Sequence, residues 1–150
     1  MANLSEVKAK VQQILVENWN VRLGNRPNTM GDFIIDFEST GIHVAVNEGE
    51  GDSVIVGLWA PVLLEVGLSE DLYKWVATVG SNYTFGHSAL FLNEDNVTGN
   101  LWFIHNLLGD YLDADELNWG LGSVGITADH LDDELQAQFG GTRACDVPSE

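Results

Sequence analysis

The chain has 150 residues, 45% of them hydrophobic, and a formal net charge of −17 at pH 7. Such a charge repels nucleic-acid phosphates and anionic lipid headgroups and attracts cationic peptides, so it argues against nucleic acid and membrane surfaces as partners. The length and the apolar fraction predict one domain with its own core over residues 1–141, followed by a disordered tail over residues 142–150.

The acidic residues are spread along the chain. Between Pro27 and Thr142 there are nineteen Asp and Glu residues and one basic residue, Lys74. Two explanations remain open, a general role in solubility or salt adaptation and the recruitment of a basic partner. The sequence favours the general role, because no acidic cluster is unusually dense.

The single cysteine, Cys145, lies in the polar tail and cannot form an internal disulfide. It is interpreted as an incidental thiol in a reducing compartment, with a redox role as the alternative. The first ten residues lack the apolar run of a signal peptide, and no segment is apolar over the length needed to cross a bilayer. We therefore expect a soluble, cytoplasmic protein.

Residues 4–18 are predicted to form an amphipathic helix, which the segment 24–28, with its Gly and Pro, then breaks. Its apolar stripe repeats at helical spacing and consists of Leu4, Val7, Val11, Ile14 and Leu15.

Three strands are predicted to follow this helix. Apolar and polar residues alternate over residues 33–38 and 42–46, which is the period of half-buried strands. A polar loop over residues 47–52 leads to a third strand over residues 53–60. The short connections predict an antiparallel meander.

The third strand is expected to be apolar on both faces. Val54, Val56 and Leu58 alternate with Ile55 and Trp59. Pro61 cannot donate a backbone hydrogen bond, so it marks a strand end, a bulge or an edge.

A second helix is predicted from an N-cap at Ser69 to about Gly80, with two acidic residues in a first turn where the helix dipole favours them. Two more strands, over residues 88–92 and 101–105, again look apolar on both faces. The last helix is predicted from a cap at Asp113 to Gly140. Its apolar stripe consists of Leu117, Leu121, Val124, Ala128, Leu131 and Leu135.

The element order is thus α-β-β-β-α-β-β-α, and the expected fold class is α+β, a twisted antiparallel sheet packed with helices.

The run Gly120-Leu-Gly122-Ser-Val-Gly125 matches the GxGxxG pattern of dinucleotide-binding loops. That pattern binds a pyrophosphate only between a strand and a helix N-terminus, whereas here it falls inside a predicted helix, so no cofactor is expected. A glycine costs about 1 kcal/mol relative to alanine inside a helix. We therefore hypothesise that a second helix, a sheet face or a bound peptide packs closely against Gly122 and Gly125, with a locally irregular helix as the alternative.

No metal site or catalytic group is predicted. The histidines His43, His87, His105 and His130 lie on different elements without ligand spacing. The acidic residues around Asp110–Glu116 lack the register of a calcium loop. No nucleophile motif occurs either, and carboxylate pairs carry no information in so acidic a chain.

Trp59, Trp102 and Ile104 are predicted on sheet faces that stay exposed if helices cover only one side. A monomer rarely leaves so much contiguous apolar surface unused, so these residues predict a homodimer surface, a peptide groove, or both. The alternative is that helices cover both faces.

Three segments give the chain a resemblance to a known family. They are Leu68-Ser-x-x-Leu72-Tyr-x-Trp-Val-Ala77, Leu107-Leu-Gly-Asp-Tyr-Leu-Asp113, and Ala128-Asp-x-Leu-Asp-Asp-Glu-Leu135 with Phe139-Gly-Gly141. On these residues the chain resembles the YbjN and type III secretion chaperone-like proteins, in particular their actinobacterial peptide-binding branch. The resemblance covers residues 3–141, and the helix glycines depart from the Ala-rich pattern of that family.

The resemblance implies a small α+β protein, often dimeric, that binds extended or amphipathic segments of other proteins without hydrolysing nucleotide. The resulting hypothesis is a non-enzymatic, homodimeric, chaperone-like protein whose client segment, basic or amphipathic, binds at Trp59, Trp102, Ile104, Gly122 and Gly125. Two alternatives are a small metal- or ligand-binding enzyme using His43 or His105, and a regulatory subunit with no ligand of its own.

Overall fold

The computed structural model describes residues 3–22, 24 and 33–147. Its main elements, in chain order, are α1 (Leu4–Trp19), β1 (Phe33–Phe37), β2 (Thr40–Glu48), β3 (Val54–Gly67), α2 (Glu70–Thr78), β4 (His87–Leu92), β5 (Thr98–Leu108), α3 (Ala114–Phe139) and β6 (Thr142–Arg143). The predicted α+β class and element order are confirmed, with β6 as an addition.

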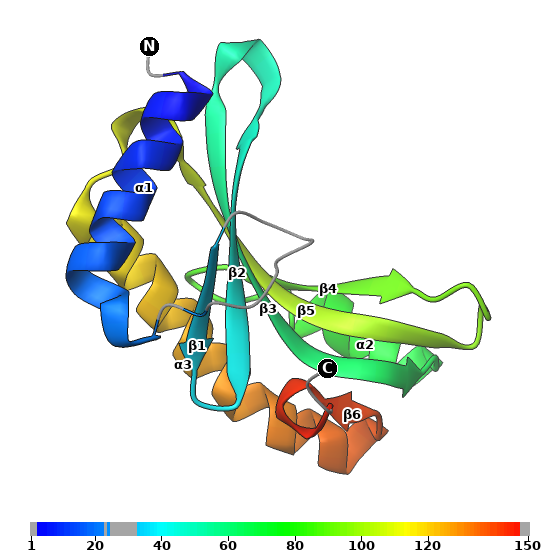
Figure 1. The fold of residues 1–150 in the computed structure, drawn as a ribbon. Coiled ribbons are helices and arrows are strands. Elements are labelled where there is room, and N and C mark those ends of the chain that lie inside the picture. The colour runs from blue at the N-terminus through cyan, green and yellow to red at the C-terminus, as the bar shows by residue number, and fades with distance from the viewer. Residues whose placement is uncertain (1–2, 23, 25–32, 148–150) are drawn as a thin grey trace.

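The strands form one antiparallel sheet in the order β1-β2-β3-β5-β4, and β6 pairs with the edge of β3 beside β2. The first three strands are the predicted meander. Figure 1 shows the β2–β3 hairpin projecting beyond the helices and the β4–β5 hairpin projecting at a large angle to it. The sheet is therefore strongly twisted, as antiparallel sheets are.

β3 continues through Pro61, where the sequence analysis placed a strand end, bulge or edge. Its pairing with β5 shifts register between Pro61 and Leu63 and again between Leu63 and Val66. Proline is tolerated at such bulges because the regular ladder is already interrupted. The carbonyl of Pro61 accepts a hydrogen bond from the Thr40 hydroxyl at 3.1 Å.

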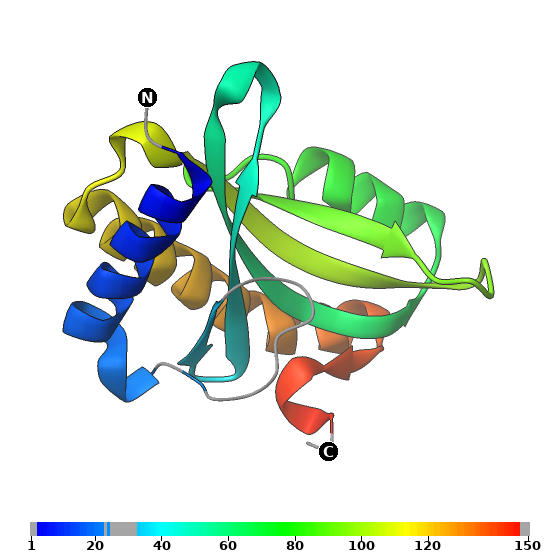
Figure 2. The same ribbon diagram turned by 45° about the horizontal axis from the view of Figure 1, so that its top comes forward.

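The three helices pack on one face of the sheet, which we call the inner face. Figures 1 and 2 show α3 running diagonally across the sheet, with α1 beside its N-terminal half and α2 next to β4 and β5. Apolar residues of all three helices share one core with the strands; the helical contribution includes Val7, Val11, Leu15, Leu72, Leu117, Leu121, Val124 and Leu135. The predicted apolar stripes of α1 and α3 are thus the buried ones.

The opposite, outer face of the sheet is not covered by any helix of the described residues. Pairing places Trp59 of β3 opposite both His43 of β2 and Ile104 of β5, and directly paired residues in an antiparallel sheet point to the same side. Trp102 and Ile104 therefore share this face with Trp59.

The C-terminal residues differ from the prediction of a disordered tail over residues 142–150. Thr142 and Arg143 pair with Leu64 and Leu63, and residues 144–146 form a 3₁₀ turn. Arg143 also binds the carboxylate of Asp133, which ties the segment to α3, and that of Asp146 within the segment itself. Residues 148–150 lie outside the described residues.

Candidate functional site

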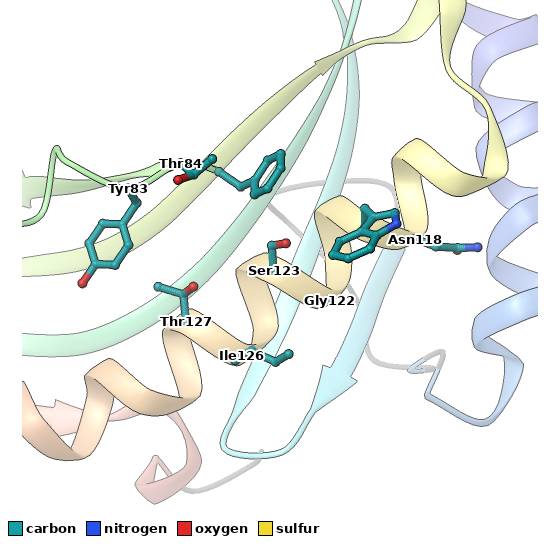
Figure 3. Close-up of a pocket in the computed structure, with 9 residues that line it drawn as sticks. Tyr83, Thr84, Asn118, Gly122, Ser123, Ile126 and Thr127 are labelled. Carbon is teal, nitrogen blue, oxygen red and sulfur yellow. The ribbon is translucent and has the colours of Figure 1, made fainter.

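A hollow of about 600 Å³ lies between α3 and the segment 83–85 that precedes β4. Figure 3 shows Ser123 and Thr127 on the side of α3 that faces Tyr83 and Thr84. The complete lining consists of Tyr83, Thr84, Phe85, Asn118, Trp119, Gly122, Ser123, Ile126 and Thr127.

A second hollow, of about 880 Å³, continues from the first toward the N-terminus of α3. The two share Thr84, Phe85 and Trp119, so they form one depression, which we call the α3 groove. The second part is also lined by His105, Leu107, Tyr111, Asp113, Asp115, Glu116 and Gly120.

The α3 groove carries large apolar side chains that face solvent. Trp119 is 71% exposed and Tyr111 is 80% exposed, while Phe85 and Ile126 are about half exposed. Exposed aromatic residues that gather around a concave surface are typical of sites that bind another protein. None of the residues that line the groove is Lys or Arg.

The three glycines of α3 have three different surroundings. A Cβ added at Gly120 would lie 2.9 Å from the Leu58 side chain, so this glycine lets the helix approach β3. A Cβ at Gly125 would lie 2.5 Å from Cγ of Phe37, so this glycine is covered by β1. A Cβ at Gly122 would meet no atom within 4 Å, although it lies on the wall of the groove. Internal packing therefore explains Gly120 and Gly125 but not Gly122.

His105 is the histidine in the α3 groove, where the ring of Phe85 packs against it at 6.0 Å between centroids. Burial and, to a lesser degree, the nearby His87 lower the pKa of His105. A carboxylate in contact would raise that pKa instead, and none is among its causes.

On the outer face, Trp59, Trp102 and Ile104 form one aromatic and aliphatic cluster. The Trp59 ring stacks on Phe91 at 6.0 Å and meets Trp102 edge-on at 6.5 Å, and Trp102 in turn lies 5.6 Å from His43. Trp102 is 8% exposed and Ile104 is 4% exposed, so both are already buried, whereas Trp59 is partly exposed.

A family model matches residues 5–147, and its description is T3SS (YopN, CesT) and YbjN peptide-binding chaperone 1, or TY-Chap1. The chain belongs to the TY-Chap1 family. The match covers nearly the whole chain, including all three helices and the complete sheet, so the resemblance inferred from the sequence is confirmed. Among curated proteins, no relative matches this chain.

The TY-Chap1 fold separates the residues that the sequence analysis grouped as one partner surface. Trp59, Trp102 and Ile104 lie on the outer face of the sheet, whereas Gly122 lies on a helix that packs on the inner face. Gly125 is covered by Phe37 of the same chain. Of the five residues, only Gly122 lines the α3 groove.

The sequence analysis missed Phe85, Trp119 and Ile126, although a signal for two of them was present. Trp119, Gly122, Ser123 and Ile126 are spaced i, i+3, i+4 and i+7, so they form a second stripe on α3 beside the buried one. Phe85 lies in an irregular segment, where no periodicity reveals which side chains face a groove.

Across residues 3–22, 24 and 33–147, no group of three or more His, Cys, Asp or Glu side chains is arranged to hold a metal ion. In the same ranges, no helix combines the length and the apolarity needed to cross a membrane.

Proposed function

We propose that this TY-Chap1 protein is a non-enzymatic, peptide-binding chaperone whose client segment occupies the α3 groove. The observation that carries the proposal is a solvent-exposed apolar groove, centred on Trp119, in a molecule with a net charge of −17. Burial of Trp119, Phe85 and Ile126 by a client removes apolar surface from water, which is the main source of affinity in such sites.

Gly122 supports this location for the client. It costs the helix about 1 kcal/mol relative to alanine, and no atom of the described residues lies within 4 Å of the place where its Cβ would be. A client whose backbone approaches α3 at this point accounts for the glycine, because only a residue without Cβ permits that approach. At Gly125 the packing partner is Phe37 of the sheet, so a bound peptide is proposed as the partner of Gly122 alone.

The proposed client is basic or amphipathic. The negative field of the chain raises the association rate of cationic segments, while apolar burial in the groove supplies the affinity. The alternative of a regulatory subunit with no ligand of its own leaves the exposed Trp119 unexplained. The enzyme alternative predicts that His43 or His105 meets a carboxylate; for His105, the histidine of the α3 groove, the causes of the lowered pKa are burial and then His87.

The test is the binding of a fluorescein-labelled, fifteen-residue Lys/Leu amphipathic peptide, followed by fluorescence anisotropy. Trp119→Ser should weaken binding at least tenfold, because a central aromatic anchor typically contributes about 2 kcal/mol. Tyr73→Ser is the matched control, since Tyr73 is an exposed aromatic residue on α2 outside the groove. Equal affinities of the two variants for the peptide would refute the proposal that the peptide binds in the α3 groove.

A second pair of variants tests the role of Gly122. Gly122→Leu places a side chain in the groove and should weaken peptide binding by a similar factor. Ala137→Leu adds the same side chain to an exposed position near the end of α3, away from the groove, and should leave binding unchanged. Circular dichroism of both variants confirms that the fold is intact.

We also propose that the protein forms a homodimer through the outer face of the sheet. Two copies that each carry −17 repel one another wherever carboxylates meet. The outer-face residues of β2, β3, β5 and β4 include no Asp or Glu in their paired segments, and Trp59, Phe91 and Leu108 are at least partly exposed there. A second copy is therefore the occupant that suits this face.

Sedimentation velocity tests the dimer. Trp59→Glu places a charge in the middle of the outer face and should yield a monomer, whereas Tyr73→Glu on α2 should not change the mass. A wild-type protein that sediments as a monomer at micromolar concentration would remove the dimer from the proposal while leaving peptide binding in the α3 groove intact.

A further inference from the structure

The α3 groove is chemically different at its two ends. At one end, beside Tyr111, three carboxylates of the first turn of α3 and its cap face the depression: Asp113, Asp115 and Glu116. At the other end the polar groups are uncharged, and they are supplied by Tyr83, Thr84, Asn118, Ser123 and Thr127. The apolar residues Phe85, Trp119 and Ile126 extend from the middle toward this uncharged end.

The acidic end keeps a negative charge after its own neighbours are taken into account. The N-terminus of a helix carries about half a positive charge, which offsets only a fraction of three carboxylates. Asp113 accepts a hydrogen bond from the Glu116 N–H at 2.8 Å, so it caps the helix. Lys10 of α1 reaches this region and donates to the Leu112 carbonyl at 3.1 Å, which removes at most one further negative charge.

The lowered pKa of His105 also helps to keep the acidic end of the groove negative. Burial keeps this imidazole neutral at pH 7, so it adds no positive charge to the acidic end of the groove. A cationic group that binds there meets carboxylates and aromatic faces, both of which attract it.

We infer that the client segment is bipartite, with basic residues at the Asp113–Glu116 end of the groove and bulky apolar residues at the Ile126 end. This inference rests on the proposed function and adds the polarity and the spacing of the client. It disfavours segments in which basic and apolar residues alternate without separation, although their composition and net charge are the same.

The spacing follows from the geometry of α3. Glu116 and Ile126 are ten residues apart on one helix, which corresponds to about 15 Å at 1.5 Å per residue. A helical client spans this distance with about ten residues, and an extended client with about five. We therefore expect the centres of the basic and apolar blocks of a bound client to lie about 15 Å apart.

Two labelled peptides of identical composition test the polarity. In the block peptide, three lysines are followed after a short polar spacer by three leucines and a tryptophan, whereas in the mixed peptide the same residues alternate. The wild-type protein should bind the block peptide about tenfold more tightly at low salt, and most of this preference should disappear at 0.5 M NaCl, because exposed charges are then screened.

Neutralising the acidic end tests the assignment of the basic block. The double variant Asp115→Asn, Glu116→Gln keeps the Asp113 cap and should weaken the block peptide about three- to tenfold while leaving the mixed peptide nearly unchanged. The matched control is Glu70→Gln, Asp71→Asn, which neutralises two exposed acids in the first turn of α2, outside the groove. The control should bind both peptides as the wild type does.

Cross-linking on the wild-type protein gives a second measurement that needs no variant. A photoreactive phenylalanine placed in the basic block should cross-link to residues 111–116, and one in the apolar block to residues 122–127. The reverse pattern, or equal binding of block and mixed peptides, overturns the bipartite inference. Failure of both peptides to bind at all would instead refute the proposed function.

Discussion

The ring of Phe37 on β1 covers Gly125 on α3 so closely that a Cβ at Gly125 would lie 2.5 Å from Cγ of the ring. Gly125→Ala forces the ring or the helix to move, and we expect it to lower the free energy of unfolding by about 1–3 kcal/mol. Urea unfolding measures this change. A neutral effect would mean that Phe37 is free to rotate away from α3.

Gly122→Ala is expected to have the opposite effect on stability. The added methyl group meets open space, and alanine is favoured over glycine in a helix interior. The free energy of unfolding should rise by up to about 1 kcal/mol in the same urea experiment. A loss of stability here would show that Gly122 also serves the fold, which would weaken its use as evidence for a client.

Trp19 of α1 donates its indole N–H to the side-chain oxygen of Asn118 on α3 at 2.7 Å. Trp19→Phe removes this hydrogen bond but retains most of the ring packing against Phe37, so the free energy of unfolding should fall by about 1 kcal/mol. Trp119→Phe is the control, because Trp119 follows Asn118 in the chain but faces solvent. It should change the free energy of unfolding by less than about 0.5 kcal/mol.

Asp132 on α3 is buried, and its Oδ1 finds no hydrogen-bond partner among the described residues. Burial raises the pKa of this carboxyl above its ordinary value of 3.8, although the Ser39 hydroxyl and Arg143 oppose the shift. The folded state therefore favours the protonated acid, and ionisation costs stability as the pH rises from about 4 through the raised pKa.

Asp132→Asn mimics the protonated acid. The variant should be more stable than the wild type at pH 7, and the difference should shrink toward zero as the pH falls to about 4. Thermal unfolding at a series of pH values measures this trend. Asp71→Asn, at an exposed position on α2, is the control for the loss of one negative charge.

The sequence predicted the fold well because periodicity and capping residues act locally. Asn3, Ser69 and Asp113 accept hydrogen bonds at the starts of the three helices, and for Ser69 and Asp113 this role was predicted from the residue type alone. A bulge was one of the alternatives predicted at Pro61, and the pairing with β5 does shift there. The continuation of β3 to Gly67 and the pairing of Thr142 with Leu64 were not predicted, because both depend on strand partners distant in the chain.

The candidate site was predicted only in part, for a physical reason. Residues such as Trp59 and Gly122 were grouped because each looked out of place on its own element. Tertiary packing decides which side of the sheet a helix covers. Because α3 packs on the inner face and Trp59 lies on the outer face, Gly122 and Trp59 are on opposite sides of the sheet. Trp119 was not considered because an exposed aromatic residue off the buried stripe looks unremarkable in sequence.

The first and last helices depend on each other across most of the chain. The contacts from Trp19 to Asn118 and from Lys10 to Leu112 join residues 99 and 102 positions apart. A helix of 16 residues is marginal in water by itself. During synthesis α1 is translated before α3, which together with β2 shelters its apolar stripe. Until α3 is translated, the nascent protein exposes part of an amphipathic segment with two lysines, Lys8 and Lys10. Such a segment is of the kind that we propose as the client.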